Sequence, residues 1–171
     1  MKVMSVTFFL PLMVFFTATG PVPRASMPVP LYHVINACDV VTKPDVELAL
    51  GRHLLEAGWQ VRSTHERCDY QAEGGQVTIR LEHSAAALDP KTEFTALKKT
   101  FPGSHARELA GLGAPAMLLD LPDAGTQVFV IDGEHRYLLV SILGFGDPAR
   151  VSKAAERLAR EAFKRSAKSI Q

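Results

Sequence analysis

Two glycine turns, each placed between strand-like segments, constrain the fold of this chain more than any other feature. The first is Glu73-Gly74-Gly75, which lies between residues 67–71 and 76–83. Its glycines supply the positive φ that a tight hairpin turn needs. Apolar residues occupy every second position of the following segment: Val77, Ile79 and Leu81. This alternation is typical of a strand with one buried face, so the sequence predicts a hairpin here.

The second turn, Asp132-Gly133, predicts a hairpin with a type I′ turn. Its strands are expected at residues 126–131 and 135–143, with a further strand before them at residues 116–121. The stretch from Tyr137 to Leu143 is almost wholly apolar, which favours a central position in the sheet.

Capping residues mark two helices in the first two thirds of the chain. Thr42 is expected to cap a helix over residues 43–50, and Gly51 fits the left-handed residue that follows a helix end. Asp89-Pro90 opens the second helix and Pro102-Gly103 ends it.

The last helix is expected to begin after Asp147, with Pro148 in its first turn, and to run to about Lys168. One of its faces is apolar, and oppositely charged residues four positions apart form the pairs Glu156–Arg160 and Glu161–Arg165 on the other side. Hairpins with intervening helices predict an α+β fold, in which about three helices pack on an antiparallel sheet. No strand–helix–strand repeat that would indicate a doubly wound fold is visible.

An apolar run near the N-terminus, residues 3–18, follows Lys2 and contains no charge. It fits the hydrophobic region of a secretory signal and is short for a membrane span, for which about 20 residues are needed. The sequence therefore predicts a signal peptide over residues 1–26, a proline-rich spacer over 27–33 and one domain over 34–168. The alternatives are an uncleaved membrane anchor and a buried helix.

The chain has two cysteines, Cys38 and Cys68, and both follow the apolar run. Two cysteines in an exported domain most simply pair, so one disulfide is expected. The alternative is two free thiols in a reducing compartment. Residues 35–38 loosely match a lipid-acylation site, but they lie too far beyond the apolar run for that reading.

Charge gives little indication of a partner. The 171-residue chain has a net charge of +1, and removal of residues 1–26 would leave 17 basic and 18 acidic residues. A nearly neutral domain without a basic block in its sequence gives no electrostatic reason to expect nucleic acid or an anionic membrane surface as partner.

The segment Gly144–Ala149 has the form G-x-G-x-x-A between a strand and a helix, as a dinucleotide-binding turn requires. The chain ends after that helix, so no further strand completes the unit, and Asp147 would repel a pyrophosphate. We expect the glycines to bend the chain into the helix. The similar segment Gly111–Ala116 is a weaker match.

Two chemical alternatives stay open. One is a metal site that uses His65 and Cys68, with Cys38 and His53 as more distant ligands. The other is a small hydrolase whose carboxylates or histidines meet only in the folded chain. Neither has a local motif, so no catalytic, metal or cofactor residue is assigned.

Several motifs together resemble those of small bacterial cell-envelope domains of unknown function that share a PsbP-like α/β sandwich and include lipoproteins. The motifs are Cys38-Asp39-Val40-Val41-Thr42, Leu50-Gly51, Cys68-Asp69-Tyr70, Leu112-Gly113-Ala114-Pro115-Ala116, the strand pair around Asp132-Gly133 and the closing Ala/Leu/Arg-rich helix. The resemblance implies an envelope protein with a disulfide between the two cysteines and no enzymatic activity. This chain lacks the acylated cysteine of the lipoprotein members.

The sequence therefore predicts a periplasmic or extracellular domain with a non-enzymatic role in the cell envelope. A protein, a lipid or a small apolar ligand is the expected partner, with no nucleic acid and no stable membrane span once the signal is removed.

Overall fold

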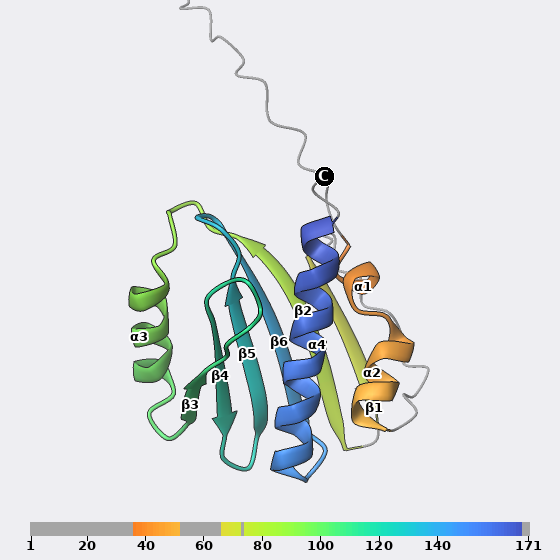
Figure 1. The fold of residues 1–171 in the computed structure, drawn as a ribbon. Helices are drawn as coiled ribbons and strands as arrows, with labels where there is room; N and C mark the ends of the chain where they lie inside the picture. The colour runs from red at the N-terminus through yellow and green to blue at the C-terminus, as the bar shows by residue number, and fades with distance from the viewer. Residues whose placement is uncertain (1–35, 52–65, 73, 169–171) are drawn as a thin grey trace, which may run out of the picture. The chain divides into compact units, whose positions relative to one another are not determined.

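In the computed structural model, which describes residues 36–51, 66–72 and 74–168, six antiparallel strands form one sheet with helices on both of its faces (Figure 1). The strands are β1 (Arg67–Ala72), β2 (Gly75–His83), β3 (His105–Glu108), β4 (Ala116–Leu121), β5 (Gly125–Ile131) and β6 (Arg136–Gly144). The helices are α1 (Ala37–Val40), α2 (Lys43–Leu50), α3 (Pro90–Thr100) and α4 (Pro148–Lys168). The predicted α+β class is confirmed.

The sheet has the strand order β1-β2-β6-β5-β4-β3. The hairpins β1–β2 and β5–β6 lie where the two glycine turns were expected, and β6 joins them by pairing with β2 along its whole length. The apolar stretch after Arg136 thus occupies the predicted central position in the sheet, with β2 paired on one side and β5 on the other.

The larger core lies between the sheet and the layer formed by α1, α2 and α4. Alternate residues of β2 and β6, such as Ile79 and Val140, are fully buried against this layer of helices. Helix α4 crosses the sheet over β5 and β6, beside α2 (Figure 1). Small residues, including Ala155 and Ala159, face the sheet from α4 and allow the helix to approach it closely.

Helix α3 packs on the opposite face of the sheet. Its Phe94 is buried with Met117 and Leu119 of β4 and Ile131 of β5. The carboxylate of Asp89 accepts a hydrogen bond from the Thr92 amide, and this confirms the predicted cap. The larger and smaller cores therefore use alternate positions of the same strands.

The predicted caps of α2 are also confirmed. Asp45 accepts hydrogen bonds from the amide and the hydroxyl of Thr42, at 2.9 and 2.7 Å. Gly51 ends the helix with φ of 61°. Together these residues fix both ends of a helix of only two turns.

The predicted disulfide joins Cys38 of α1 to Cys68 of β1, with 5.1 Å between the two Cα atoms. It links the segment before α2 to the first hairpin, as expected. Next to it, the hydroxyl of Tyr70 donates a hydrogen bond to the carbonyl of Val41. Both contacts hold the N-terminal helical segment against the sheet.

Three local features differ from the sequence prediction. Helix α1 and strand β3 were not predicted, since α1 is a single turn capped by Asn36 and β3 is a mostly exposed edge strand without apolar alternation. The type I′ turn was wrong, because residues 132–135 connect the strands and Gly133, but not Asp132, has a positive φ.

The described residues lie in the compact unit Tyr32–Gln171. The predicted signal peptide over 1–26, the spacer over 27–33 and a short strand expected around Trp59 and Val61 fall outside the described residues and stay predictions. Within the described ranges, no helix has the length and apolar character that crossing a membrane requires.

Candidate functional site: a basic groove between α2 and α4

An open groove of about 410 Å³ lies where the end of α2 meets the first half of α4. Ala49 lines it from α2, and the residues that line it from α4 include Ala149, Arg150, Lys153, Ala154 and Arg157. Three of these six side chains are cationic, while the others are small and apolar. The lining therefore combines small apolar residues with three cationic side chains, which we call the basic rim of the groove.

The helical period explains why three cations lie together here. Helix α4 turns Val151 and Leu158 toward the sheet, where both are buried. Arg150, Lys153 and Arg157 follow one another at spacings of three and four residues, so they share the opposite, exposed face. The guanidinium of Arg150 also lies beside Gly51, at the end of α2.

The rim has little opposing charge. No ion pair joins Arg150, Lys153 or Arg157 to another described residue. Asp147 is the acidic residue on the groove, and its carboxylate accepts hydrogen bonds from the amides of Ala149 and Arg150, at 3.1 and 3.3 Å. Among the described residues that line the groove, three cations and one carboxylate give a net formal charge of +2.

Such an arrangement can hold an anionic group. A guanidinium presents a planar set of donors that matches the oxygens of a phosphate or a carboxylate, and a lysine ammonium adds a mobile positive charge. The volume of the groove falls within the range of sites for small ligands, which is roughly 300–1,000 Å³.

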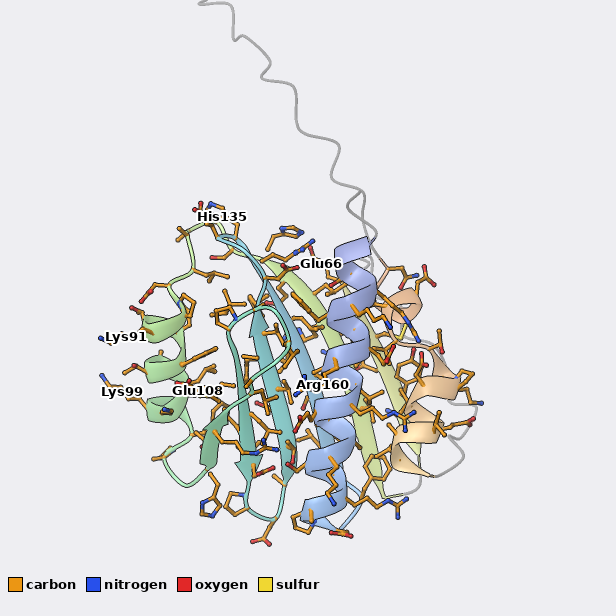
Figure 2. All side chains as sticks on the ribbon, viewed as in Figure 1. Glu66, Lys91, Lys99, Glu108, His135 and Arg160 are labelled. Atoms are coloured by element: carbon orange, nitrogen blue, oxygen red, sulfur yellow. A yellow bond between two sulfur atoms is a disulfide. The ribbon has the colours of Figure 1, made fainter. Side chains whose placement is uncertain are left out.

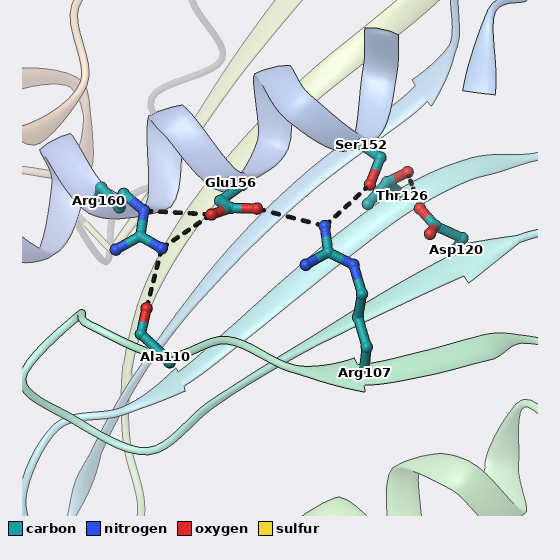
Figure 3. Close-up of polar contacts among 7 residues, drawn as sticks. All are labelled: Arg107, Ala110, Asp120, Thr126, Ser152, Glu156 and Arg160. Atoms are coloured by element: carbon teal, nitrogen blue, oxygen red, sulfur yellow. Dashed lines mark hydrogen bonds and ion pairs between the residues drawn. The ribbon is translucent and has the colours of Figure 1, made fainter. Parts of the chain in front are cut away.

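Two other cations of α4, Arg160 and Arg165, are engaged within the protein. Arg160 donates to Glu156 of the same helix and to the carbonyl of Ala110, and Glu156 also accepts from Arg107 of β3 at 3.2 Å (Figure 3). The hydrogen bond from Arg160, aided by Arg107, holds the pKa of Glu156 below its usual range. This network ties β3 and the following loop to α4. It also contains the Glu156–Arg160 pair predicted from the sequence.

A second polar group lies on the opposite face of the sheet, across β1 and β2. Asp69 accepts hydrogen bonds from Arg67, Gln76 and Thr78. Burial acts to raise the pKa of Asp69, but these hydrogen bonds outweigh it, so the pKa lies below its usual range. Three neighbouring side chains thus use the acceptor sites of this carboxylate, as in a structural cluster.

The hydrolase alternative requires a titratable group with a shifted pKa in the cleft. Among the described residues, lowered carboxyl pKa values occur at Asp45, Asp69, Asp89 and Glu156. The cause at Asp89 is its cap hydrogen bonds with Thr92. None of these four carboxylates lines the groove. The groove instead presents arginine and lysine side chains, whose polar atoms are hydrogen-bond donors.

Of the four proposed metal ligands, the two cysteines lie among the described residues. Cys68 is bonded to Cys38, so neither sulfur is available as a thiolate ligand or for lipid attachment in this form. His53 and His65 fall outside the described residues. No cluster of three or more His, Cys, Asp or Glu side chains suited to a metal occurs in the described part of the chain.

The glycines of the G-x-G-x-x-A segment shape the backbone, as expected. Gly144 has φ of 80°, and a Cβ there would lie 2.1 Å from the carbonyl oxygen of Gly74. Helix α4 follows a strand of an antiparallel sheet, and no parallel strand among the described residues completes a dinucleotide-binding unit. In the weaker match, Gly111 and Gly113 also have positive φ values.

The sequence reasoning missed the basic groove. The signal was present in the three-and-four spacing of Arg150, Lys153 and Arg157, which a helical projection places on one face. The contribution of Ala49 had no comparable signal, because it depends on how α2 packs beside α4.

No family model, no curated protein and no solved structure matches this chain.

Proposed function

We propose that this protein is an exported, non-enzymatic binding domain of the cell envelope that holds an anionic group of its ligand in the groove between α2 and α4. The observation that carries the proposal is the convergence of Arg150, Lys153 and Arg157 on one groove without an ion-pair partner among the described residues. Arg160 and Arg165, elsewhere on the same helix, are paired with protein carboxylates.

Two features support the export part of the proposal. The apolar run over residues 3–18 has the length and flanking charge of a secretory signal. A disulfide such as Cys38–Cys68 is compatible with an oxidising compartment. The resemblance to cell-envelope domains with a PsbP-like sandwich points in the same direction.

A binding role is favoured over hydrolysis by the chemistry of the groove. A general acid or base that works near neutral pH needs a pKa close to 7. The groove offers two arginines and a lysine, whose cationic donors bind and orient anions, and none of the described carboxylates with a shifted pKa lines it.

The experiment is a titration of the ¹⁵N-labelled protein with inorganic phosphate at low ionic strength, followed by amide chemical shifts. We expect saturable shifts at Ala49 and along residues 149–157. Arg157→Gln should weaken the apparent affinity about tenfold, as loss of a charge-assisted contact would. Lys98→Gln on α3 removes the same charge far from the groove and is the matched control.

The proposal is wrong if phosphate produces no saturable shifts, or if Arg157→Gln and Lys98→Gln change the titration equally. In the second case the anion would be responding only to the net charge of the protein.

A further inference from the structure

The basic surface on α4 continues beyond the groove. Lys164 is exposed and forms no ion pair with a described residue. At 100° per residue, Arg150, Lys153, Arg157 and Lys164 lie within about 60° of one another around the helix axis. The four cations therefore form one line, about 21 Å long at 1.5 Å per residue. We call these four residues the α4 basic stripe.

Ion pairs flank the α4 basic stripe on both sides. Arg160 pairs with Glu156 on the side of β3, and Arg165 pairs with Asp45 on the side of α2. Glu161 lies 3.7 Å from Arg165. These ion pairs lie along the two edges of the α4 basic stripe. Between them, the four cations of the stripe, which form no ion pair with a described residue, point away from the sheet.

An exposed apolar side chain lies in the same layer. Leu48 of α2 is 65 % exposed, the largest value among the large apolar side chains of the described residues. Val46 and Leu50, two positions to either side, are buried in the core, so Leu48 points away from the sheet as the stripe does. Next to it, Ala49 lines the groove.

Cations in line on a helix beside an outward-facing leucine fit an anionic lipid surface. Lipid phosphates attract basic side chains, and an apolar side chain enters the interface between headgroups and acyl chains. An acidic peptide would satisfy the cations but gives no reason for the exposed Leu48. Resting on the proposed function, we infer that the anionic groups recognised by this protein are headgroup phosphates of a membrane surface, which the α4 basic stripe and Leu48 contact together.

The experiment is cosedimentation of the protein, purified after export to a bacterial periplasm, with vesicles of equimolar phosphatidylglycerol and phosphatidylcholine. Vesicles of phosphatidylcholine alone measure any contribution of the apolar run at residues 3–18, because insertion of that run needs no anionic lipid. We expect binding to the anionic vesicles that high salt weakens.

Two variants outside the basic rim of the groove test the inference specifically. Lys164→Glu should lower the vesicle partition coefficient about tenfold, and Leu48→Ser about fivefold. Neither should change the phosphate titration of the groove by more than about twofold, because neither residue lines it. Lys99→Glu, the same change on α3, should leave vesicle binding close to that of the wild type.

The outcomes separate the two proposals. Phosphate shifts at the groove without vesicle binding, or vesicle binding that Lys164→Glu and Leu48→Ser leave unchanged, would overturn the lipid assignment and leave the groove in place. Binding to poly-glutamate but not to anionic vesicles would indicate an acidic protein partner, and this result would also overturn the lipid assignment. If the wild-type protein shows neither phosphate-induced shifts at the groove nor binding to anionic vesicles, both proposals are wrong.

Discussion

Arg165, near the end of α4, donates two hydrogen bonds to the carboxylate of Asp45 in the first turn of α2. Its Nη1 and Nη2 atoms lie 2.5 and 3.0 Å from the two carboxylate oxygens. Arg165 also donates to the carbonyl of Val40, so one guanidinium joins α4 to both short helices. This contact fixes the position of α2, and with it the wall of the groove that Ala49 forms.

Asp45→Asn should lower the free energy of unfolding by about 1–3 kcal/mol at neutral pH, the range for a hydrogen-bonded charged pair. Arg165 holds the pKa of Asp45 well below the ordinary 3.8. A lowered folded-state pKa gives stability that is complete above the unfolded-state value and is lost as pH falls through the folded-state value. Urea unfolding of both proteins from pH 7 to pH 2 should therefore show the difference shrinking in acid. A difference that stayed constant would contradict this role of the pair.

Reduction of the disulfide should destabilise the fold strongly. Cys38 and Cys68 are 30 positions apart, and closing a loop of that length stabilises a protein by about 3–4 kcal/mol in the chain-entropy model. Urea unfolding of the wild type and of the double variant Cys38→Ser/Cys68→Ser, each with and without reductant, measures the contribution of the disulfide to the free energy of unfolding. Reductant should affect the wild type alone, and an equal response of the two would show that the bond does not contribute.

Gly144 and Gly146 allow a test with matched backbone strain, because both have φ of 80°. A Cβ on Gly144 would meet the carbonyl oxygen of Gly74 at 2.1 Å, whereas one on Gly146 meets nothing within 4 Å. Gly146→Ala should cost about 1–2 kcal/mol from the left-handed backbone alone. Gly144→Ala should cost clearly more, since strand β2 would have to move. Thermal unfolding ranks the two variants, and equal losses would refute the packing role of Gly144.

Tyr70 should ionise late in alkaline titration. Burial, with smaller contributions from the charges of Asp45 and Asp39, raises its pKa to about 12. A raised folded-state pKa means that this contribution to stability is complete below the unfolded-state value of about 10 and is lost as pH rises through 12. The ultraviolet difference spectrum between the wild type and Tyr70→Phe isolates this tyrosine. A midpoint near 10 would contradict its burial against α1.

Much of the fold follows from local sequence signals. The caps at Thr42, Asp89 and Asp147 and the alternation along β2 mark elements whose residues interact with near neighbours in the chain. Strand β3 had no such signal, because an edge strand needs no apolar alternation when one side faces solvent. Helix α1 has only four residues, too few to show the repeated apolar spacing that identifies a helix, and it is held by packing and by Cys38.

The candidate site was harder to predict, because total composition conceals the arrangement of charge. A nearly neutral chain was read as giving no reason for an anionic partner. In the folded chain, carboxylates such as Asp45 and Glu156 are used within the protein, so their charges do not offset Arg150 and Arg157 at the groove. The helical spacing of the cations could have indicated a basic face, but which cations stay unpaired depends on tertiary contacts.

The most direct measurement is the phosphate titration repeated on two triple variants of equal charge. One reverses the groove cations, as Arg150→Glu/Lys153→Glu/Arg157→Glu. The other reverses Lys91, Lys98 and Lys99 on α3, a helix that lies on the other face of the sheet from α4 and carries Lys91 and Lys99 well away from the Arg160 side chain (Figure 2).

Both variants lose six units of positive charge, so they differ only in where the charge is lost. We predict that the groove variant loses the saturable shifts at Ala49 and residues 149–157, while the α3 variant keeps them with an affinity within about threefold of the wild type. Equal loss in both variants, or shifts that persist in the groove variant, would contradict an anion site between α2 and α4.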